Sequence, residues 1–173
     1  MDTFETNYAT VNYKIHFILT GGTIDSYYDV DKCTVLPFEH SVIPKYINEF
    51  VGLKNDQVIY TEICMKDSRD LDEIDMKNVL HTIEESPHNK FIITLGTYTL
   101  FNNALYLQSN LKKKNDLTVV LTGSMIPLEG FVPSDAAFNL GYAISEVCNL
   151  PPGVYVCING KKYLPENNPH LHS

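Results

Sequence analysis

Short apolar runs alternate along this chain with segments of helical periodicity. Five runs have the length and continuous apolar character of strands that are buried on both faces. They are Tyr13–Leu19, Gln57–Ile63, Phe91–Leu95, Leu117–Leu121 and Val154–Ile158. Four segments between them carry helix-start signals or apolar residues at the spacing of one helix face. We predict helices at Val42–Val51, capped by Ser41, and at Asp72–Glu85, Thr99–Leu111 and Ser134–Val147.

This alternation predicts an α/β fold. Strands joined through helices use right-handed crossovers, which give a parallel sheet with helices on both faces. We therefore predict an open, mainly parallel sheet in a three-layer, flavodoxin-like or Rossmann-like arrangement. The 173 residues fit one domain, spanning residues 1–173, with residues 1–11 and 164–173 expected to be poorly ordered.

Composition narrows the classes of function. The chain is 44% hydrophobic and 20% charged, as in ordinary soluble globular proteins. Its net charge of −8 argues against nucleic acid or an anionic membrane surface as a partner. The longest apolar runs are of strand length and no signal peptide is visible, so we expect a cytoplasmic protein. The four cysteines show neither C-x-x-C nor metal-ligand spacing, so we expect free thiols and neither a metal nor a cofactor.

Glycine and hydroxyl residues follow three of the predicted strands. The first strand ends in Thr20–Thr23 (Thr-Gly-Gly-Thr), the third in Leu95–Thr99 and the fourth in Thr122–Met125, while the second ends in Met65–Ser68. The carboxyl ends of parallel strands lie along one edge of a sheet, so these groups can converge on one crevice. Hydroxyls and backbone N–H groups there suit a carboxylate, an amide carbonyl or an oxyanion.

These motifs resemble those of the L-asparaginase family of threonine amidohydrolases. Residues 20–24 are similar to that family's amino-terminal signature, and residues 96–99 (Gly-Thr-Tyr-Thr) resemble its Gly-Thr-Asp-Thr signature. Residues 120–127, followed by 134–140, resemble its next block. The resemblance covers nearly the whole chain, but only the larger, amino-terminal domain of the usual two-domain enzymes. It is closer to short single-domain members, which share the motifs at residues 65–68 and 154–160.

The resemblance implies hydrolysis of a side-chain amide, that of asparagine or of a related small amide, with release of ammonia. Thr23 would be the nucleophile that forms an acyl-enzyme, assisted by Tyr27 or Tyr28. Thr97 would act beside the scissile amide and the attacking water. The implied substrate-binding residues are Gly22, Gly96, Tyr98, Lys66, Asp67, Ser68 and Ser124. Members of the family form dimers and tetramers, which implies a homodimer or homotetramer.

The chain departs from the family pattern where the family carries charge. Tyr98 stands in place of an aspartate that binds the substrate's α-amino group, and Leu95 stands in place of a histidine. The family's lysine follows the last strand, where Lys161 and Lys162 come too early in register and His170 is nearest to the matching position.

The missing charges leave other hypotheses open. Asp25, Lys66 or Asp67 could compensate, because each belongs to a strand-end loop. Alternatively, the chain could bind a small carboxylate or amide ligand without turnover. A third possibility is a regulatory or structural role on the same scaffold.

Overall fold

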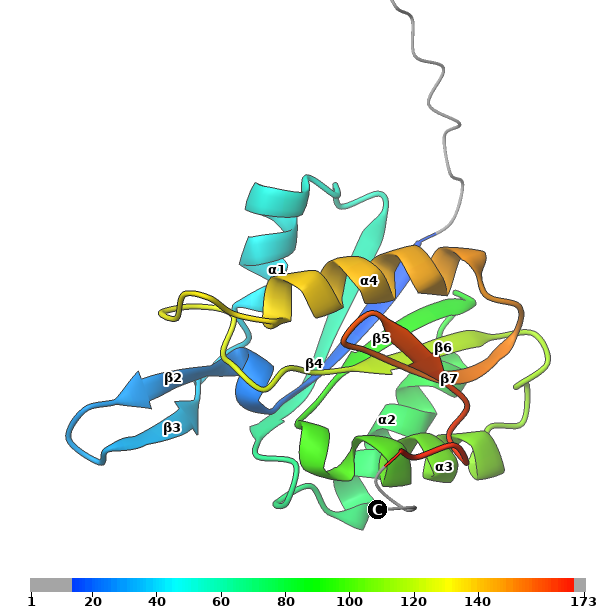
Figure 1. The fold of residues 1–173 in the computed structure, drawn as a ribbon. Coiled ribbons are helices and arrows are strands. Elements are labelled where there is room, and N and C mark those ends of the chain that lie inside the picture. The colour runs from blue at the N-terminus through cyan, green and yellow to red at the C-terminus, as the bar shows by residue number, and fades with distance from the viewer. Residues whose placement is uncertain (1–13, 170–173) are drawn as a thin grey trace, which may run out of the picture.

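A computed structural model describes residues 14–169 and confirms the predicted fold class (Figure 1). Its centre is a sheet in the order β4-β1-β5-β6-β7-β8. The strands are β1 (Ile15–Gly21), β4 (Val58–Lys66), β5 (Lys90–Thr94), β6 (Thr118–Thr122), β7 (Gly153–Ile158) and β8 (Lys161–Tyr163). All neighbours pair in parallel except β7 and β8, which are antiparallel.

The order of the parallel strands is that of a flavodoxin-like sheet. If the five parallel strands are numbered 1 to 5 along the chain, from β1 through β4, β5 and β6 to β7, their order across the sheet is 2-1-3-4-5. After β1 the chain forms β4 on one lateral side of β1, and it then crosses over to form β5 on the other lateral side. Loops that follow β1 and β5 diverge at this point, which leaves a crevice at the carboxyl ends of the two strands.

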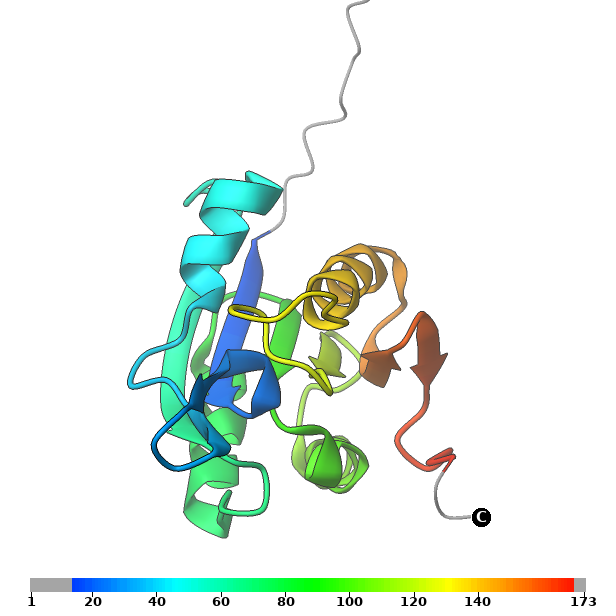
Figure 2. The ribbon, with the colours of Figure 1, turned by 60° about the vertical axis from the view of Figure 1, so that its left-hand side comes forward.

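Helices cover both faces of the sheet (Figures 1 and 2). One face carries α1 (Ile43–Tyr46), which continues into a π-helical turn (Ile47–Val51), and α4 (Ala136–Asn149). The other face carries α2 (Glu73–Glu85) and α3 (Leu100–Asn110). The strands are apolar on both faces because each face contacts one of two buried clusters, one under α1 and α4 and one under α2 and α3.

Side chains start the helices much as the sequence predicts. Asp72 caps α2 and forms a capping box with Asp75. The Ser41 hydroxyl accepts the N–H of Ile43 at the start of α1. At α4 the Ser134 hydroxyl accepts the N–H of Ala136.

The structure contains strands that the periodicity does not predict. β2 (Ser26–Asp29) and β3 (Thr34–Pro37) form an antiparallel hairpin that projects from the body of the fold (Figure 1). β8 turns back from β7 through Asn159 and Gly160, whose φ angles of 52° and 69° fit the Asn-Gly hairpin turn. These strands are short and largely exposed, so they carry no buried apolar pattern.

The segments expected to be poorly ordered fall mostly outside the described residues. Tyr13, residues 1–11 and residues 170–173 lie there. Residues 164–169 form a turn after β8, in which Asn167 N–H donates to the Leu164 carbonyl at 2.9 Å and Pro165 is buried. No helix between residues 14 and 169 is long and apolar enough to cross a membrane. The four cysteines are free, with Cys33 exposed and Cys157 buried.

His16 is a buried titratable group far from the carboxyl edge of the sheet. Its Nδ1 lies 3.0 Å from Ser86 Oγ and its Nε2 lies 2.8 Å from Thr61 Oγ1. Burial, with a smaller contribution from His88, lowers the pKa of His16 from 6.5 to about 4. The folded chain therefore holds His16 neutral at pH values where the unfolded chain binds a proton.

This difference in pKa predicts an acid-dependent loss of stability. As the pH falls from about 7 to about 5, protonation of His16 in the unfolded state should lower the free energy of unfolding by about 2 kcal/mol. His16→Asn should remove this component. The difference in the free energy of unfolding between wild type and variant should therefore shrink by that amount over the same pH range. Urea unfolding at both pH values measures it, with the exposed His81→Asn as control. An unchanged difference would refute the prediction.

Candidate active site

Thr23 and Thr97 follow the two central strands at the same edge of the sheet. Thr23 opens the 3-10 turn η1 (Thr23–Asp25) after β1, and Thr97 opens η3 (Thr97–Thr99) after β5. β1 and β5 pair in parallel along their length. Both threonines therefore stand at the point where the strand order reverses, which is where open α/β sheets bind ligands.

Glycines let the loops after β1, β4 and β5 touch. A Cβ on Gly22 would lie 2.2 Å from the backbone nitrogen of Gly96, and a Cβ on Gly96 would lie 2.6 Å from Ser68 Oγ. Gly22 also has a φ of 80°, which side chains rarely adopt. No larger residue fits at either position without moving a loop.

The turn that carries Thr23 is held by backbone hydrogen bonds from other elements. The Gly22 N–H donates to the Lys66 carbonyl at the end of β4, at 2.8 Å. The Leu128 N–H, from the loop before α4, donates to the Ile24 carbonyl at 3.1 Å. Because both sides of the turn are fixed, the position of Thr23 is set by the sheet rather than by a free loop.

Three strand-end loops line a small, open pocket of about 170 Å³. Its lining residues are Thr23, Asp67, Ser68, Arg69, Gly96, Thr97 and Tyr98. Six of these seven are residues that the sequence singles out, and the structure brings them together. Tyr98, with 80% of its surface exposed, stands at the rim.

A wider groove of about 860 Å³ runs from Thr23 toward the β2–β3 hairpin. Tyr28 lines this groove together with Thr23. Tyr27 packs instead against Phe38, with the two rings tilted and their centroids 5.3 Å apart, and it does not line this groove. Of the two tyrosines, the structure thus places only Tyr28 in a groove shared with Thr23.

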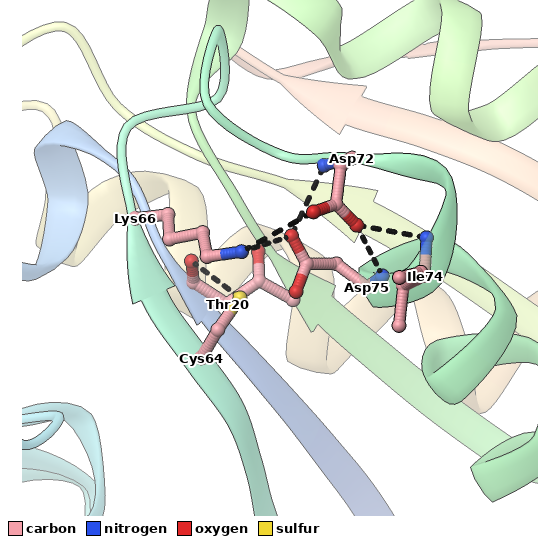
Figure 3. Close-up of polar contacts among 6 residues, drawn as sticks. All are labelled: Thr20, Cys64, Lys66, Asp72, Ile74 and Asp75. Carbon is pink, nitrogen blue, oxygen red and sulfur yellow. Dashed lines mark hydrogen bonds and ion pairs between the residues drawn. The ribbon is translucent and has the colours of Figure 1, made fainter.

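Lys66 lines the same groove, but its ammonium group is engaged elsewhere. Figure 3 shows its Nζ directed at the start of α2, where it donates to Asp75 Oδ2 at 2.6 Å and lies 3.8 Å from Asp72 Oδ2. The hydrogen bond to Asp75 raises the pKa of Lys66. Lys66 therefore fastens the end of β4 to α2 and is not directed at Thr23.

Asp67 and Arg69 place one charge of each sign at the small pocket. Arg69 Nε donates to Asp67 Oδ1 at 2.9 Å, and a second nitrogen of the same guanidinium lies 3.2 Å from Asp67 Oδ2. This pairing lowers the pKa of Asp67, so its carboxylate stays ionised. A ligand that carries both an ammonium and a carboxylate group would find a partner for each.

Ser124 is not part of this arrangement. It is buried, and its hydroxyl donates to the Ile126 carbonyl at 2.6 Å. It lines neither the small pocket nor the groove. The same turn is fixed by Asp135, whose carboxylate accepts the N–H groups of Met125 and Ile126. Ser124 thus shapes the loop after β6.

Of the seven residues that line the small pocket, only Arg69 was not singled out from the sequence. Arg69 directly follows the Met65–Ser68 motif, so an extension of that motif by one residue includes it. Met125 lies with its sulfur 3.4 Å from Thr97 Oγ1, a contact that no local pattern signals. Within residues 14–169, no group of three or more His, Cys, Asp or Glu side chains could hold a metal ion.

Asp25 lies under the Thr23 turn and not in the pocket. It is fully buried, and its Oδ1 accepts the Val42 N–H at 2.8 Å, while Oδ2 has no hydrogen-bond partner. Burial raises the pKa of Asp25 to about 6, opposed in part by hydrogen bonds from Ser41 and Val42 and reinforced by Glu62 and Glu129. The structure therefore does not place Asp25 where it could replace a charge toward a ligand.

The family model "Asparaginase, N-terminal" matches residues 14–173, and the chain belongs to this family. No curated protein matches it.

Solved structures with this fold include L-asparaginases. The thermostable L-asparaginase from Thermococcus kodakarensis is 26% identical, with a TM-score of 0.72, over 88% of this chain and 46% of that one. The probable cytoplasmic L-asparaginase from Campylobacter jejuni is 28% identical, with a TM-score of 0.67, over 89% and 46%. L-asparaginase I from Vibrio cholerae shares the fold at 24% identity and a TM-score of 0.70, over 88% and 47%. The chain thus spans about half the length of each.

The raised pKa of Asp25 predicts the pH dependence of the turn's stability. The folded state favours the protonated form of Asp25. The contribution of Asp25 to the free energy of unfolding is therefore fully present below the unfolded pKa of 3.8 and is lost as the pH rises through about 6. Asp25→Asn removes the buried charge. Its stability relative to wild type should therefore rise by about 2 kcal/mol between pH 4.5 and pH 7.5. Chemical unfolding at both pH values tests this, with the exposed Asp31→Asn as control; a flat difference would contradict it.

Proposed function

We propose that this chain is an amidohydrolase that cleaves the side-chain amide of asparagine or a related small amide and releases ammonia. One observation carries the proposal: Thr23 and Thr97, from loops far apart in sequence, line the same small pocket at the point where the strand order reverses. Membership in the asparaginase family supports it.

In this proposal Thr23 is the nucleophile. Its Oγ attacks the amide carbonyl, and the hydroxyl proton passes to the leaving nitrogen, so that ammonia departs and an ester to Thr23 remains. Backbone N–H groups near Thr23 and Thr97 would stabilise the oxyanion. Thr97 would orient the water that hydrolyses the ester and restores the Thr23 hydroxyl. Tyr28 is the tyrosine we favour as a proton relay, because it shares a groove with Thr23.

Asp67 and Arg69 are the substrate-binding groups we favour. The family's amine-binding aspartate is replaced by Tyr98, which has a phenol in place of a carboxylic acid. The Asp67 carboxylate lines the same pocket and stays ionised, so it can bind an ammonium group there. Arg69 can bind the carboxylate of the same ligand. We further propose, from the family alone, a homodimer or homotetramer.

One observation favours a second candidate, a protein that binds the amide without turnover. None of the seven residues that line the small pocket is a lysine or a histidine, and the Lys66 ammonium is held by Asp75. A pocket that offers neither a lysine nor a histidine to take up the hydroxyl proton activates a threonine weakly.

An ammonia-release assay decides between the two candidates. Purified chain should release ammonia from asparagine, glutamine or succinamate, and Thr23→Ala should abolish the release. Thr97→Ala should lower it by about 10²-fold or more, the usual cost of losing a group that acts in the transition state. The control is Thr82→Ala on α2, outside the pocket, which should leave the rate unchanged.

The other outcomes are equally clear. Release that survives in Thr23→Ala would exclude Thr23 as the nucleophile. If no amide is hydrolysed by wild type, a thermal-shift titration with aspartate and succinate follows. Saturable stabilisation would then favour binding without turnover, and no shift would leave neither candidate standing.

A further inference from the structure

A second and larger cavity adjoins the small pocket. Its volume is about 700 Å³, and it shares Thr97 and Tyr98 with the pocket that contains Thr23. Two elements supply most of its wall: the start of α3, and the hairpin formed by β7 and β8. A volume of this size is typical of sites that enclose a molecule considerably larger than an amino acid.

The hairpin directs one lysine toward this cavity and its neighbour away from it. Successive side chains of a strand point to opposite faces, and both Lys161 and Tyr163 line the cavity. Lys162, between them, bonds instead to Glu146 on α4, with Nζ 3.1 Å from Oε2. The turn is fixed as well, because the Asn159 N–H donates to Asn139 Oδ1 at 2.8 Å.

The chemistry of the wall suits an anion with an apolar body. Leu100, Phe101, Ile158 and Tyr163 supply apolar surface, with the rings of Phe101 and Tyr163 5.6 Å apart in an edge-to-face contact. Lys161 is the one charged residue among the described residues that line the cavity. This local positive charge occurs on a chain whose net charge is −8.

We infer that this cavity is a second subsite, which binds the apolar or aromatic part of a carboxylate-bearing amide while Lys161 pairs with the carboxylate. The inference rests on the proposed function and deepens it. The substrate class then extends from free asparagine to side-chain amides that carry an apolar substituent, such as an N-acylated asparagine. The carboxylate of such an amide pairs with Lys161 instead of Arg69, and its acylated nitrogen brings no ammonium group to Asp67. Thr97 and Tyr98 are the boundary where the two parts of such a molecule meet.

Binding of a product-like ligand tests the subsite without any need for turnover. Calorimetric titration should show N-benzoyl-L-aspartate binding about tenfold more tightly than N-acetyl-L-aspartate, because the ring leaves water. Lys161→Met should weaken binding of the benzoyl compound about fivefold, as expected for a partly exposed charge pair, and Lys161→Arg should restore it. Lys162→Met is the matched control and should leave the affinity unchanged.

Each alternative result overturns the subsite. Equal affinity for the two compounds would show that the cavity does not bind the ring. An equal loss of affinity for the benzoyl compound in Lys161→Met and Lys162→Met would show that Lys161 does not pair specifically with its carboxylate. Absence of binding by either compound would also refute it. Ammonia release from N-benzoyl-L-asparagine and asparagine is measured in parallel. Benzoyl-aspartate binding without any ammonia release would refute the proposed hydrolysis alone, and asparagine hydrolysis without such binding would refute the subsite alone.

Discussion

The close approach of backbone to backbone at the carboxyl edge of the sheet is the constraint on which the candidate site depends. Gly22 lies against the Leu95–Gly96 backbone, Gly96 lies against Ser68, and a Cβ on Gly123 would lie 2.3 Å from the Leu95 carbonyl oxygen. A methyl group at any of these contacts would push two strand-end loops apart. Because glycine has no Cβ, the loops can approach closely enough for Thr23 and Thr97 to line one pocket.

Charge at this edge is arranged differently from what the family pattern would suggest. The charged side chains nearest the threonines are already paired: Lys66 with Asp75, and Asp67 with Arg69. The first pair stabilises the junction of β4 and α2. The second is exposed at the pocket and can exchange its internal partner for a ligand at modest cost, because a solvated ion pair contributes little net energy. In the proposed function, recognition of a charged substrate is therefore assigned to Asp67 and Arg69 and not to the position of Tyr98.

Periodicity predicted the layers of this fold but not its hairpins. The five parallel strands and the four helices carry apolar residues at regular spacing because each must bury one or two faces. β2, β3 and β8 bury little, so their sequences lack that pattern, although Asn159–Gly160 is a typical hairpin turn and could have indicated β8. At the site, glycine and hydroxyl residues were found because they follow strands. Asp25 and Ser124 follow strands too, but only coordinates show that both are buried.

The hairpin also explains why counting along the sequence is a poor guide to cations near the site. In register with the family, Lys161 and Lys162 come too early after the last parallel strand. A two-residue turn reverses the chain, however, and returns it antiparallel to β7, so distance along the sequence no longer measures distance from the strand end. Because side chains alternate along the strand, the two lysines point in opposite directions. Lys161 lines the 700 Å³ cavity that Thr97 also lines, and Lys162 contacts Glu146 on α4. The two-residue period of β8 thus determines that Lys161, and not Lys162, faces the cavity, and the apolar pattern of the sequence does not reveal this strand.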